Sequence, residues 1–361
     1  MRKALPLVIV AVLLSSCFII QRQGSEHGKI SKERQYLALR SYNEGISYLR
    51  AGDYRQAINS FQKSIEQNPE EPDTYFAMGL AFGELGEPVH EIAAYDLALK
   101  VDPKFAPAYD GKGIALANLE KYNAAIECFK NAIKLDSRFA RAHINIGILY
   151  AKTEQWELAL LSFDNAIDEK VALEDAYYNK GYTLGRMGKY TDALSCFNKV
   201  LDLDEYHVQA YYSKASILNE LGRYDEAILA LDHATTIASY WADAHFNKGI
   251  LFAKKAMIVR TKEDDEKANV LLEESVKCFD EAIKKNPQHY RAYNNRGLAL
   301  FELRDIDPAI ASLDRAIDIR PDYFEAYFNK GTILEGTGKP EKAEEAFSKA
   351  REIKGGSTQQ E

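Results

Sequence analysis

The stretch Glu174–His207 reads EDAYYNKGYTLGRMGKYTDALSCFNKVLDLDEYH, and its pattern recurs along the chain every 34 residues. The clearest marker is a glycine at position 8 of each repeat, which Ala215 replaces once. The glycines are Gly45, Gly79, Gly113, Gly147, Gly181, Gly249, Gly297 and Gly331. Every step is 34 residues except the 48 residues between Gly249 and Gly297. A period of this length is typical of stacked helical hairpins, so the chain is an array of similar elements.

Each repeat carries small and apolar residues at helical steps of three and four, which predicts two helices. Position 4 is Tyr in six repeats, position 20 is Ala in seven, and position 24 is always large and apolar. A glycine or a charged residue near position 15 and a Pro or Ser near position 32 end the helices. The small residues at positions 8 and 20 let the two helices approach closely. We expect the ring at position 24 and the Tyr at position 4 to fill the space toward the next repeat.

In the order and spacing of these positions, residues 38–357 resemble the tetratricopeptide repeat family. The resemblance implies an all-α fold, a right-handed α-α superhelix (solenoid) of nine helical hairpins forming one elongated domain. The repeats are 38–71, 72–105, 106–139, 140–173, 174–207, 208–241, 242–289, 290–323 and 324–357. Residues 358–361 are expected to form a flexible tail.

The seventh repeat, 242–289, holds 14 additional residues between about 256 and 272. Residues 257–260 and 268–272 have helical patterns, and the charged residues 262–265 are the expected turn. Both helices should therefore be longer by roughly two turns, about 10 Å each. Two interpretations stay open: a contact for a specific partner, or a tolerated surface insertion.

The N-terminus has the layout of an export signal. Arg2 and Lys3 precede an apolar run, and the quartet Leu14–Cys17 resembles a bacterial lipobox. We predict a signal peptide at 1–17, lipidation of Cys17 and a polar tether at 18–37 that holds the array at a membrane of the cell envelope. The alternatives are a cleaved secretory signal and an uncleaved N-terminal membrane anchor.

Composition and residue placement disfavour several function classes. With 54 acidic and 46 basic residues and a net charge of -8, the chain has no electrostatic reason to bind nucleic acid. The histidines are scattered over different repeat positions without the spacing of metal ligands. Cys128, Cys196 and Cys278 all occupy position 23, too far apart for a disulfide, so we expect shielded packing residues. We therefore predict a protein that is not an enzyme and has no metal site and no cofactor.

Position 6 carries the polar signal with the clearest functional meaning, an asparagine in six repeats. The six are Asn43, Asn145, Asn179, Asn247, Asn295 and Asn329. The resemblance places positions 5, 6 and 9 on the concave side of the superhelix. An amide both donates and accepts, so an asparagine ladder can bind the peptide groups of an extended protein segment. The alternative is a structural consensus that fixes neighbouring helices.

Positions 5 and 7 describe the surroundings of that ladder. Position 5 is aromatic at five places, for which we predict contact with the bound segment: Phe76, Tyr178, Tyr212, Phe246 and Phe328. Position 7 is basic in six repeats, and a solvated or snorkelling stripe is favoured there over a track for anionic ligands.

These features predict an adaptor that binds proteins or peptides in extended conformation and assembles complexes at the cell envelope. Two alternatives are kept. The array could act as an architectural protein that forms a homodimer through its end repeats. It could also act as an accessory activator of an envelope enzyme.

Overall fold

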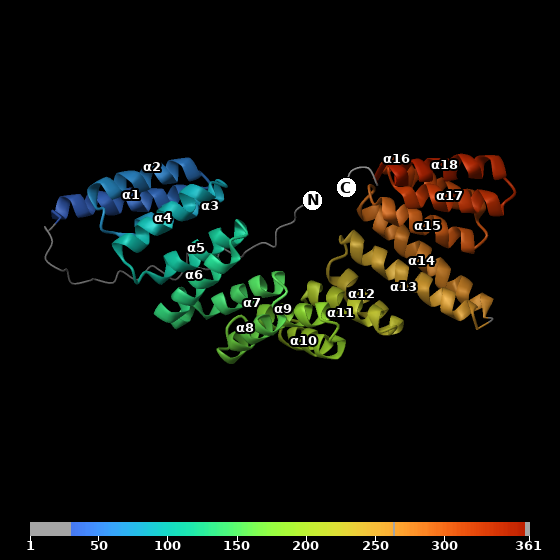
Figure 1. The fold of residues 1–361 in the computed structure, drawn as a ribbon, viewed down its shortest axis with the longest axis horizontal. Helices are drawn as coiled ribbons and strands as arrows, with labels where there is room; N and C mark the ends of the chain where they lie inside the picture. The colour runs from blue at the N-terminus through green and yellow to red at the C-terminus, as the bar shows by residue number, and fades with distance from the viewer. Residues whose placement is uncertain (1–29, 263, 358–361) are drawn as a thin grey trace. The chain divides into compact units, whose positions relative to one another are not determined.

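The computed structural model describes residues 30–262 and 264–357, which form eighteen α-helices and one 3-10 helix and contain no strand (Figure 1). The chain divides into two compact blocks at Lys121. The N-terminal block contains α1 (Lys32–Ala51), α2 (Tyr54–Gln67), α3 (Pro72–Glu84), α4 (Pro88–Val101) and α5 (Ala106–Asn118). The C-terminal block contains α6 (Tyr122–Leu135), η2 (Ser137–Arg141), α7 (Ala142–Lys152), α8 (Trp156–Asp168), α9 (Leu173–Arg186), α10 (Tyr190–Leu203), α11 (Val208–Glu220), α12 (Tyr224–Ile237), α13 (Ala242–Arg260), α14 (Asp265–Lys285), α15 (Tyr290–Glu302), α16 (Ile306–Ile319), α17 (Phe324–Gly336) and α18 (Pro340–Ser357).

Within each block the fold is a stack of helical hairpins, as the repeat predicts. Apart from α5 and α6, which belong to different blocks, each first helix packs against the second helix of its repeat, and that second helix packs against the first helix of the next. The turn inside the hairpin has a left-handed residue at position 15. Gly188 takes this conformation at φ 75°, and Arg304 takes it without being glycine, at φ 70°. This reversal lets the second helix run back along the first.

The contact that sets the distance between the two helices joins position 8 to position 24 of the same repeat. A Cβ added to Gly147 would lie 2.5 Å from Cε1 of Phe163, a ring that is 0% exposed. The same contact, at 2.5 or 2.6 Å, recurs at Gly45–Phe61, Gly79–Tyr95, Gly249–Phe279 and Gly331–Phe347. The ring therefore packs on the glycine of its own repeat, and at Tyr95 it also reaches the next repeat, where a Cβ on Gly111 would lie 2.8 Å from Cζ.

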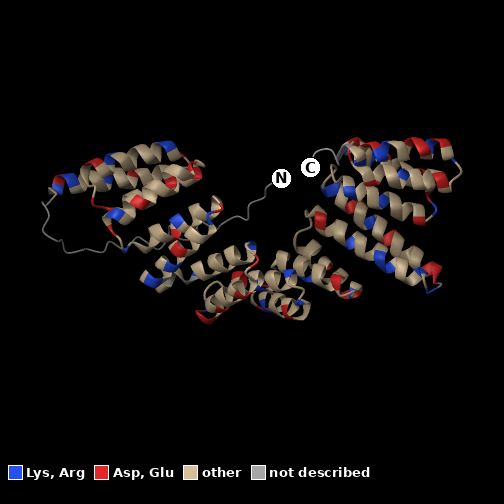
Figure 2. Ribbon diagram, viewed as in Figure 1, with Lys and Arg blue, Asp and Glu red and all other residues tan. Residues whose placement is uncertain are grey.

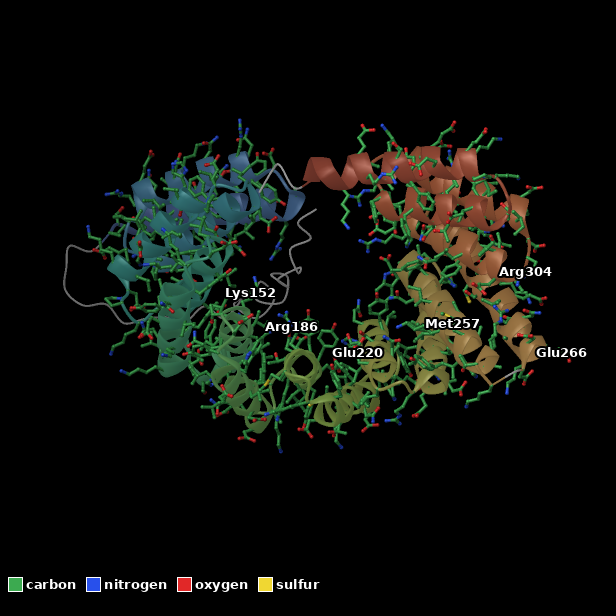
Figure 3. All side chains as sticks on the ribbon, turned by 45° about the vertical axis from the view of Figure 1, so that its right-hand side comes forward. Lys152, Arg186, Glu220, Met257, Glu266 and Arg304 are labelled. Carbon is green, nitrogen blue, oxygen red and sulfur yellow. The ribbon has the colours of Figure 1, made fainter. Side chains whose placement is uncertain are left out.

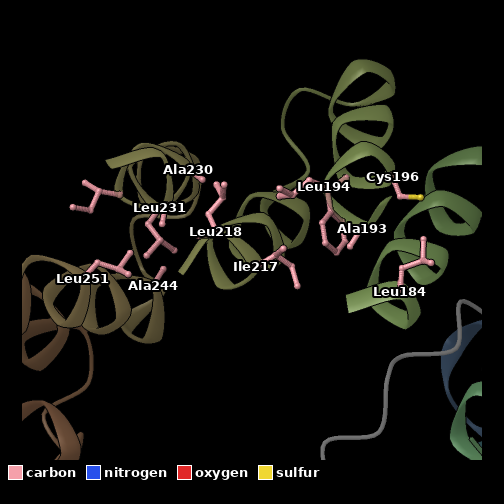
Figure 4. Close-up of a cluster of buried hydrophobic side chains, with 14 residues drawn as sticks. Leu184, Ala193, Leu194, Cys196, Ile217, Leu218, Ala230, Leu231, Ala244 and Leu251 are labelled. Atoms are coloured by element: carbon pink, nitrogen blue, oxygen red, sulfur yellow. The ribbon is translucent and has the colours of Figure 1, made fainter. Parts of the chain in front are cut away.

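Aliphatic side chains carry the core from one repeat to the next. In the C-terminal block Leu184 on α9, Leu218 on α11, Leu231 on α12 and Leu251 on α13 belong to one buried cluster (Figure 4). Each of these side chains is 4% exposed or less. Because no single hairpin could bury this surface alone, the core depends on stacking.

The three cysteines at position 23 lie in this packed interior. Cys128, Cys196 and Cys278 are 9%, 8% and 7% exposed, which confirms that they are shielded. Burial raises the pKa of the Cys196 thiol and raises that of Cys278 to about 11. Both thiols are therefore protonated near neutral pH, which makes them weak nucleophiles.

The seventh repeat has the two long helices that its extra residues predict. Helix α13 has 19 residues and α14 has 21, against 13 and 14 in α15 and α16. The added six and seven residues lengthen the helices by about 9 and 10 Å. Asp264 caps α14 by accepting a hydrogen bond from the Lys267 amide. Arg260, the last residue of α13, forms an ion pair with Glu302 of α15, so the end of the lengthened helix is held against the following repeat.

The N-terminal boundary differs from the expectation. Helix α1 begins at Lys32, with Ser31 accepting a hydrogen bond from the Arg34 amide, so the last residues of the predicted tether 18–37 are helical. The predicted signal peptide 1–17, Cys17 and the tail 358–361 lie outside the described residues. No helix within the described ranges has both the length and the apolar character needed to cross a bilayer.

Glu91 is an exception at position 20, where seven other repeats have Ala. Its carboxyl group lies against the backbone of α3, where a Cβ on Gly83 would be 2.9 Å from Oε1. The Tyr95 hydroxyl lies 3.5 Å from the same oxygen. Burial, together with the charge of Glu84, raises the pKa of Glu91 to about 7, and the Tyr95 hydroxyl opposes this shift. The contact between α3 and α4 therefore contains a carboxyl group, that of Glu91, whose neutral form is favoured by its surroundings.

We predict that Gly147→Ala lowers the free energy of unfolding by about 1–3 kcal/mol, because its methyl group would overlap a fully buried ring. Gly336→Ala is the matched control, since its nearest neighbour would be Cζ of Phe301 at 4.0 Å. The control should be neutral or more stable by about 0.5–1 kcal/mol. Urea denaturation followed by circular dichroism measures both, and equal stability of the two variants would contradict the close-approach interpretation.

We predict that the stability of the protein falls between pH 4.5 and about 7 because of Glu91. Its folded pKa lies above its unfolded value, so the folded state binds the proton more tightly in this window and loses that advantage as pH rises. Glu91→Ala should remove this component and be more stable than the wild type at pH 8 by about 2 kcal/mol. Urea midpoints at pH 5 and pH 8 test this, with Glu91→Gln as the non-titrating control of similar size. An unchanged difference between the two pH values in both variants would refute it.

Candidate functional site

The predicted binding residues lie at positions 5 and 6 of the first helices. We name this surface of the C-terminal block the first-helix face; Asn43 on α1 and Phe76 on α3 belong to the N-terminal block and are not part of it. Five of the six asparagines are partly buried, and Asn43 on α1 is exposed. Asn145, Asn179, Asn247, Asn295 and Asn329 come from α7, α9, α13, α15 and α17 of the C-terminal block. One residue type is thus presented at the same helical position by successive hairpins.

Two of these asparagines join neighbouring first helices. Asn247 donates from Nδ2 to the Tyr212 hydroxyl at 2.5 Å, and Asn329 donates to Oδ1 of Asn294 at 2.9 Å. Both bonds link position 6 to position 5 of the preceding repeat. At these two places the structure agrees with the structural alternative, in which the asparagine fixes adjacent helices.

Two other asparagines have hydrogen bonds only within their own helix. Asn179 donates to the Asp175 carbonyl at 2.7 Å and Asn295 to the Arg291 carbonyl at 2.9 Å. An amide has two N–H donors and an oxygen that accepts, so each of these side chains keeps an acceptor and a second donor. These two residues retain the polar groups that binding of a peptide group requires.

The aromatic residues at position 5 pack chiefly against the ring at position 34 of the same repeat. Ring centroids of Tyr212 and Trp241 are 4.6 Å apart, and those of Phe246 and His289 are 4.7 Å apart. Tyr178 stacks on His207 at 5.3 Å, and Phe76 meets Phe105 edge to face at 5.8 Å. The exposed fraction is 9% for Phe246 and 49% for Phe328. A bound segment would thus meet the edges of most of these rings, and a larger surface at Phe328.

Two histidines at position 34 have a capping role that the sequence does not indicate. Nδ1 of His207 accepts a hydrogen bond from the Ala210 amide at 3.1 Å, and Nδ1 of His289 accepts one from the Ala292 amide at 3.2 Å. Each imidazole thereby caps the start of the next first helix while it packs against the position 5 ring. Among the described residues no three His, Cys, Asp or Glu side chains gather as a metal site.

The basic residues at position 7 form contacts between repeats and not a solvated stripe. Each reaches position 25 of the preceding second helix, sixteen residues earlier in the sequence. The pairs are Lys112–Asp96, Lys180–Asp164, Lys248–Asp232, Arg296–Asp280 and Lys330–Asp314, with Lys214 bonded to Asn198. In the five ion pairs the basic side chains are 22–28% exposed. These cations are thus mostly buried along their length and paired at the charged end, which departs from a solvated stripe and agrees with a snorkelling one, and a track for anionic ligands is not supported.

Cations at position 13 form a further series of contacts in the C-terminal block. Lys152 lies 5.9 Å from the centroid of the Tyr122 ring, and Arg186 lies 5.8 Å from that of Trp156. Glu220 follows at the same position of the next repeat, so the sign of the charge changes along the row (Figure 3). Acidic and basic residues are likewise interspersed along the helices of each block (Figure 2).

Comparisons with known proteins agree with this geometry. Models of the tetratricopeptide repeat match residues 178–244, 271–324 and 302–358, and a second repeat model matches 38–86 and 115–153. The chain belongs to the tetratricopeptide repeat family. No curated protein is significantly similar to it in sequence.

Solved structures show the same fold at low sequence identity. The C-terminal part of a repeat protein from Cytophaga hutchinsonii is 16% identical, with a TM-score of 0.58, and the match covers 70% of this chain and 98% of that one. PilW, described as a type IV pilus biogenesis factor, is 20% identical with a TM-score of 0.51, covering 56% and 94%. MamA from Desulfovibrio magneticus is 18% identical with a TM-score of 0.44, covering 51% and 96%. At these identities the likeness concerns the fold.

Proposed function

We propose that this protein is a non-enzymatic adaptor that binds extended polypeptide segments along its first-helix face and assembles complexes at the cell envelope. Its fold supports the coarser part of this statement, because stacked tetratricopeptide hairpins serve protein–protein interaction. The finer part rests on the first-helix face. The observation that carries it concerns Asn179 and Asn295. Each amide donates a hydrogen bond to its own helix, and its oxygen accepts none from the described residues.

The chemistry of this face suits a backbone ligand better than a specific side chain. An amide oxygen and an amide N–H can pair with the N–H and C=O of a peptide group whatever its side chain. The edges of Tyr178 and the exposed Phe328 ring add apolar contact area beside these amides. We therefore expect broad selection for extended segments with apolar residues.

Not every asparagine contributes equally in this proposal. Asn247 and Asn329 donate to the neighbouring repeat and mainly keep the first helices in register. Asn145, Asn179 and Asn295 are the proposed ligand contacts. Phe328 adds an exposed ring in the last repeat.

The location at the envelope is proposed from the sequence of the first 17 residues. The basic start, the apolar run and the quartet that ends at Cys17 support export and lipidation. The stacked hairpins would then be held at a membrane surface. The uncleaved anchor and the cleaved secretory signal are the competing outcomes of its test.

We predict that replacing Asn145, Asn179 and Asn295 together by Ala weakens capture of extended segments at least tenfold without changing helicity. The reason is that each removed amide would leave one peptide group of the ligand without its partner. An array of unstructured peptides that tile envelope proteins, probed with purified chain, measures this. The matched control replaces Asn59, Asn131 and Asn165, exposed asparagines of second helices, by Ala. Equal loss in both variants, or no loss in either, would contradict the proposed site.

We predict that the mature N-terminus is a diacylglyceryl-modified Cys17. Intact-mass spectrometry of the membrane-extracted protein checks this, and Cys17→Ser should release the protein from the membrane fraction or leave the precursor unprocessed. An unmodified N-terminus beyond residue 17 would indicate a simple secretory signal. A chain that still begins at Met1 would indicate an uncleaved anchor.

A further inference from the structure

The row of contacts between position 7 and position 25 has one member of different chemistry. Five of the six basic residues face an aspartate of the preceding second helix, and Lys214 faces Asn198. Lys214 Nζ donates to Asn198 Oδ1 at 2.8 Å, so the hydrogen bond is kept while the opposite charge is missing. Burial lowers the pKa of Lys214, and the charges of Glu226 and Asp202 oppose this shift without reversing it.

Lys214 also lines a pocket of about 580 Å³ between α10, α11 and α12. Tyr211 and His233 form one wall, with ring centroids 4.9 Å apart and planes only 18° from parallel. Leu201 and Leu229 supply apolar surface, and the Leu229 side chain is 58% exposed. Asn198 and Lys214 supply polar groups to the same pocket. Hydrogen-bond donors, aromatic surface and aliphatic surface are thus combined in one cavity.

The two acidic residues of the pocket have other cationic partners. Glu226 accepts two hydrogen bonds from the Arg223 guanidinium, both at 2.6 Å. Asp202 lies 3.9 Å from Nζ of Lys199. Neither forms an ion pair with Lys214, whose ammonium has three N–H groups and donates one of them to Asn198.

We propose that this pocket binds an acidic side chain, an aspartate or glutamate of a partner polypeptide, with an apolar residue beside it. The carboxylate would accept a hydrogen bond from one of the two remaining N–H groups of Lys214 and supply the charge that an aspartate of the protein supplies in the five other pairs. The neighbouring apolar residue would pack on Leu229 and on the Tyr211–His233 stack. This site uses none of the position 6 asparagines and goes beyond the proposed function.

The pattern of the repeats supplies the decisive variant. Asn198→Asp gives Lys214 the aspartate that its counterparts have, at a position where five repeats of this chain carry it without disturbing the fold. The variant should compete internally with the ligand. Asn198→Ala is the control, because it removes the amide and leaves the charge of Lys214 uncompensated.

The test uses two capped tripeptides, acetyl-Leu-Glu-Leu-amide and acetyl-Leu-Gln-Leu-amide, added to the full chain with labelled leucine methyl groups. In NMR titrations we expect the Glu peptide to shift the Leu201 and Leu229 signals and to bind at least tenfold more tightly than the Gln peptide. Asn198→Asp should abolish that difference, and Asn198→Ala should retain it.

Equal binding of the two peptides, unchanged binding to Asn198→Asp, or no shift with either peptide would overturn the proposal. The variant that lacks Asn145, Asn179 and Asn295 should bind the Glu peptide like the wild type. Failure of the first-helix face and failure of this pocket are therefore distinguishable.

Discussion

The structure depends on the contact between the residue at position 8 and the side chain at position 24 within one hairpin. A ring carbon lies only 2.5 or 2.6 Å from where a methyl group would be at Gly45, Gly79, Gly147, Gly249 and Gly331. This approach buries the ring and sets the distance between the two helices. The sixth repeat has Ala215 instead of glycine at position 8 and Leu231 instead of an aromatic ring at position 24. The larger residue on the first helix therefore faces a smaller side chain on the second. In the eighth repeat Gly297 faces Leu313 without such compensation, so side-chain volume is not conserved in every repeat.

Given hairpins of one shape, polar contacts determine how they stack. Position 7 reaches the preceding second helix, and position 6 reaches the preceding first helix at Asn247 and Asn329. Charged and amide groups bind a partner only at a particular distance and orientation. These contacts therefore fix the register in which one hairpin stacks on the next. Partly exposed ion pairs of this kind add little stability one by one. Their regular repetition is more informative, because it makes the single exception at Asn198 visible.

The repeat pattern predicted the hairpins, their number, the shielding of the cysteines and the two long helices of the seventh repeat. These features follow from local periodicity, which is written in the order of the residues. The repeat pattern did not predict features that depend on which side chains become neighbours in the folded protein. Helix α1 begins at Lys32, and five of the six basic residues at position 7 form ion pairs between repeats. The candidate site was predicted as a row of identical asparagines, yet the structure divides them into inter-helix and intra-helix donors.

The sequence by itself determined that this protein is an array of helical hairpins, because spacing along the chain selects the helix, the turn and the small residues at the contact. Only the tertiary structure decided what each recurring polar residue does. A partner thirty-five residues away, such as Tyr212 for Asn247, or sixteen residues away, such as Asn198 for Lys214, is chosen when the hairpins stack. Hydrogen bonds and charges act over a few ångströms in space, so which of them remain open to a ligand is settled by packing between repeats.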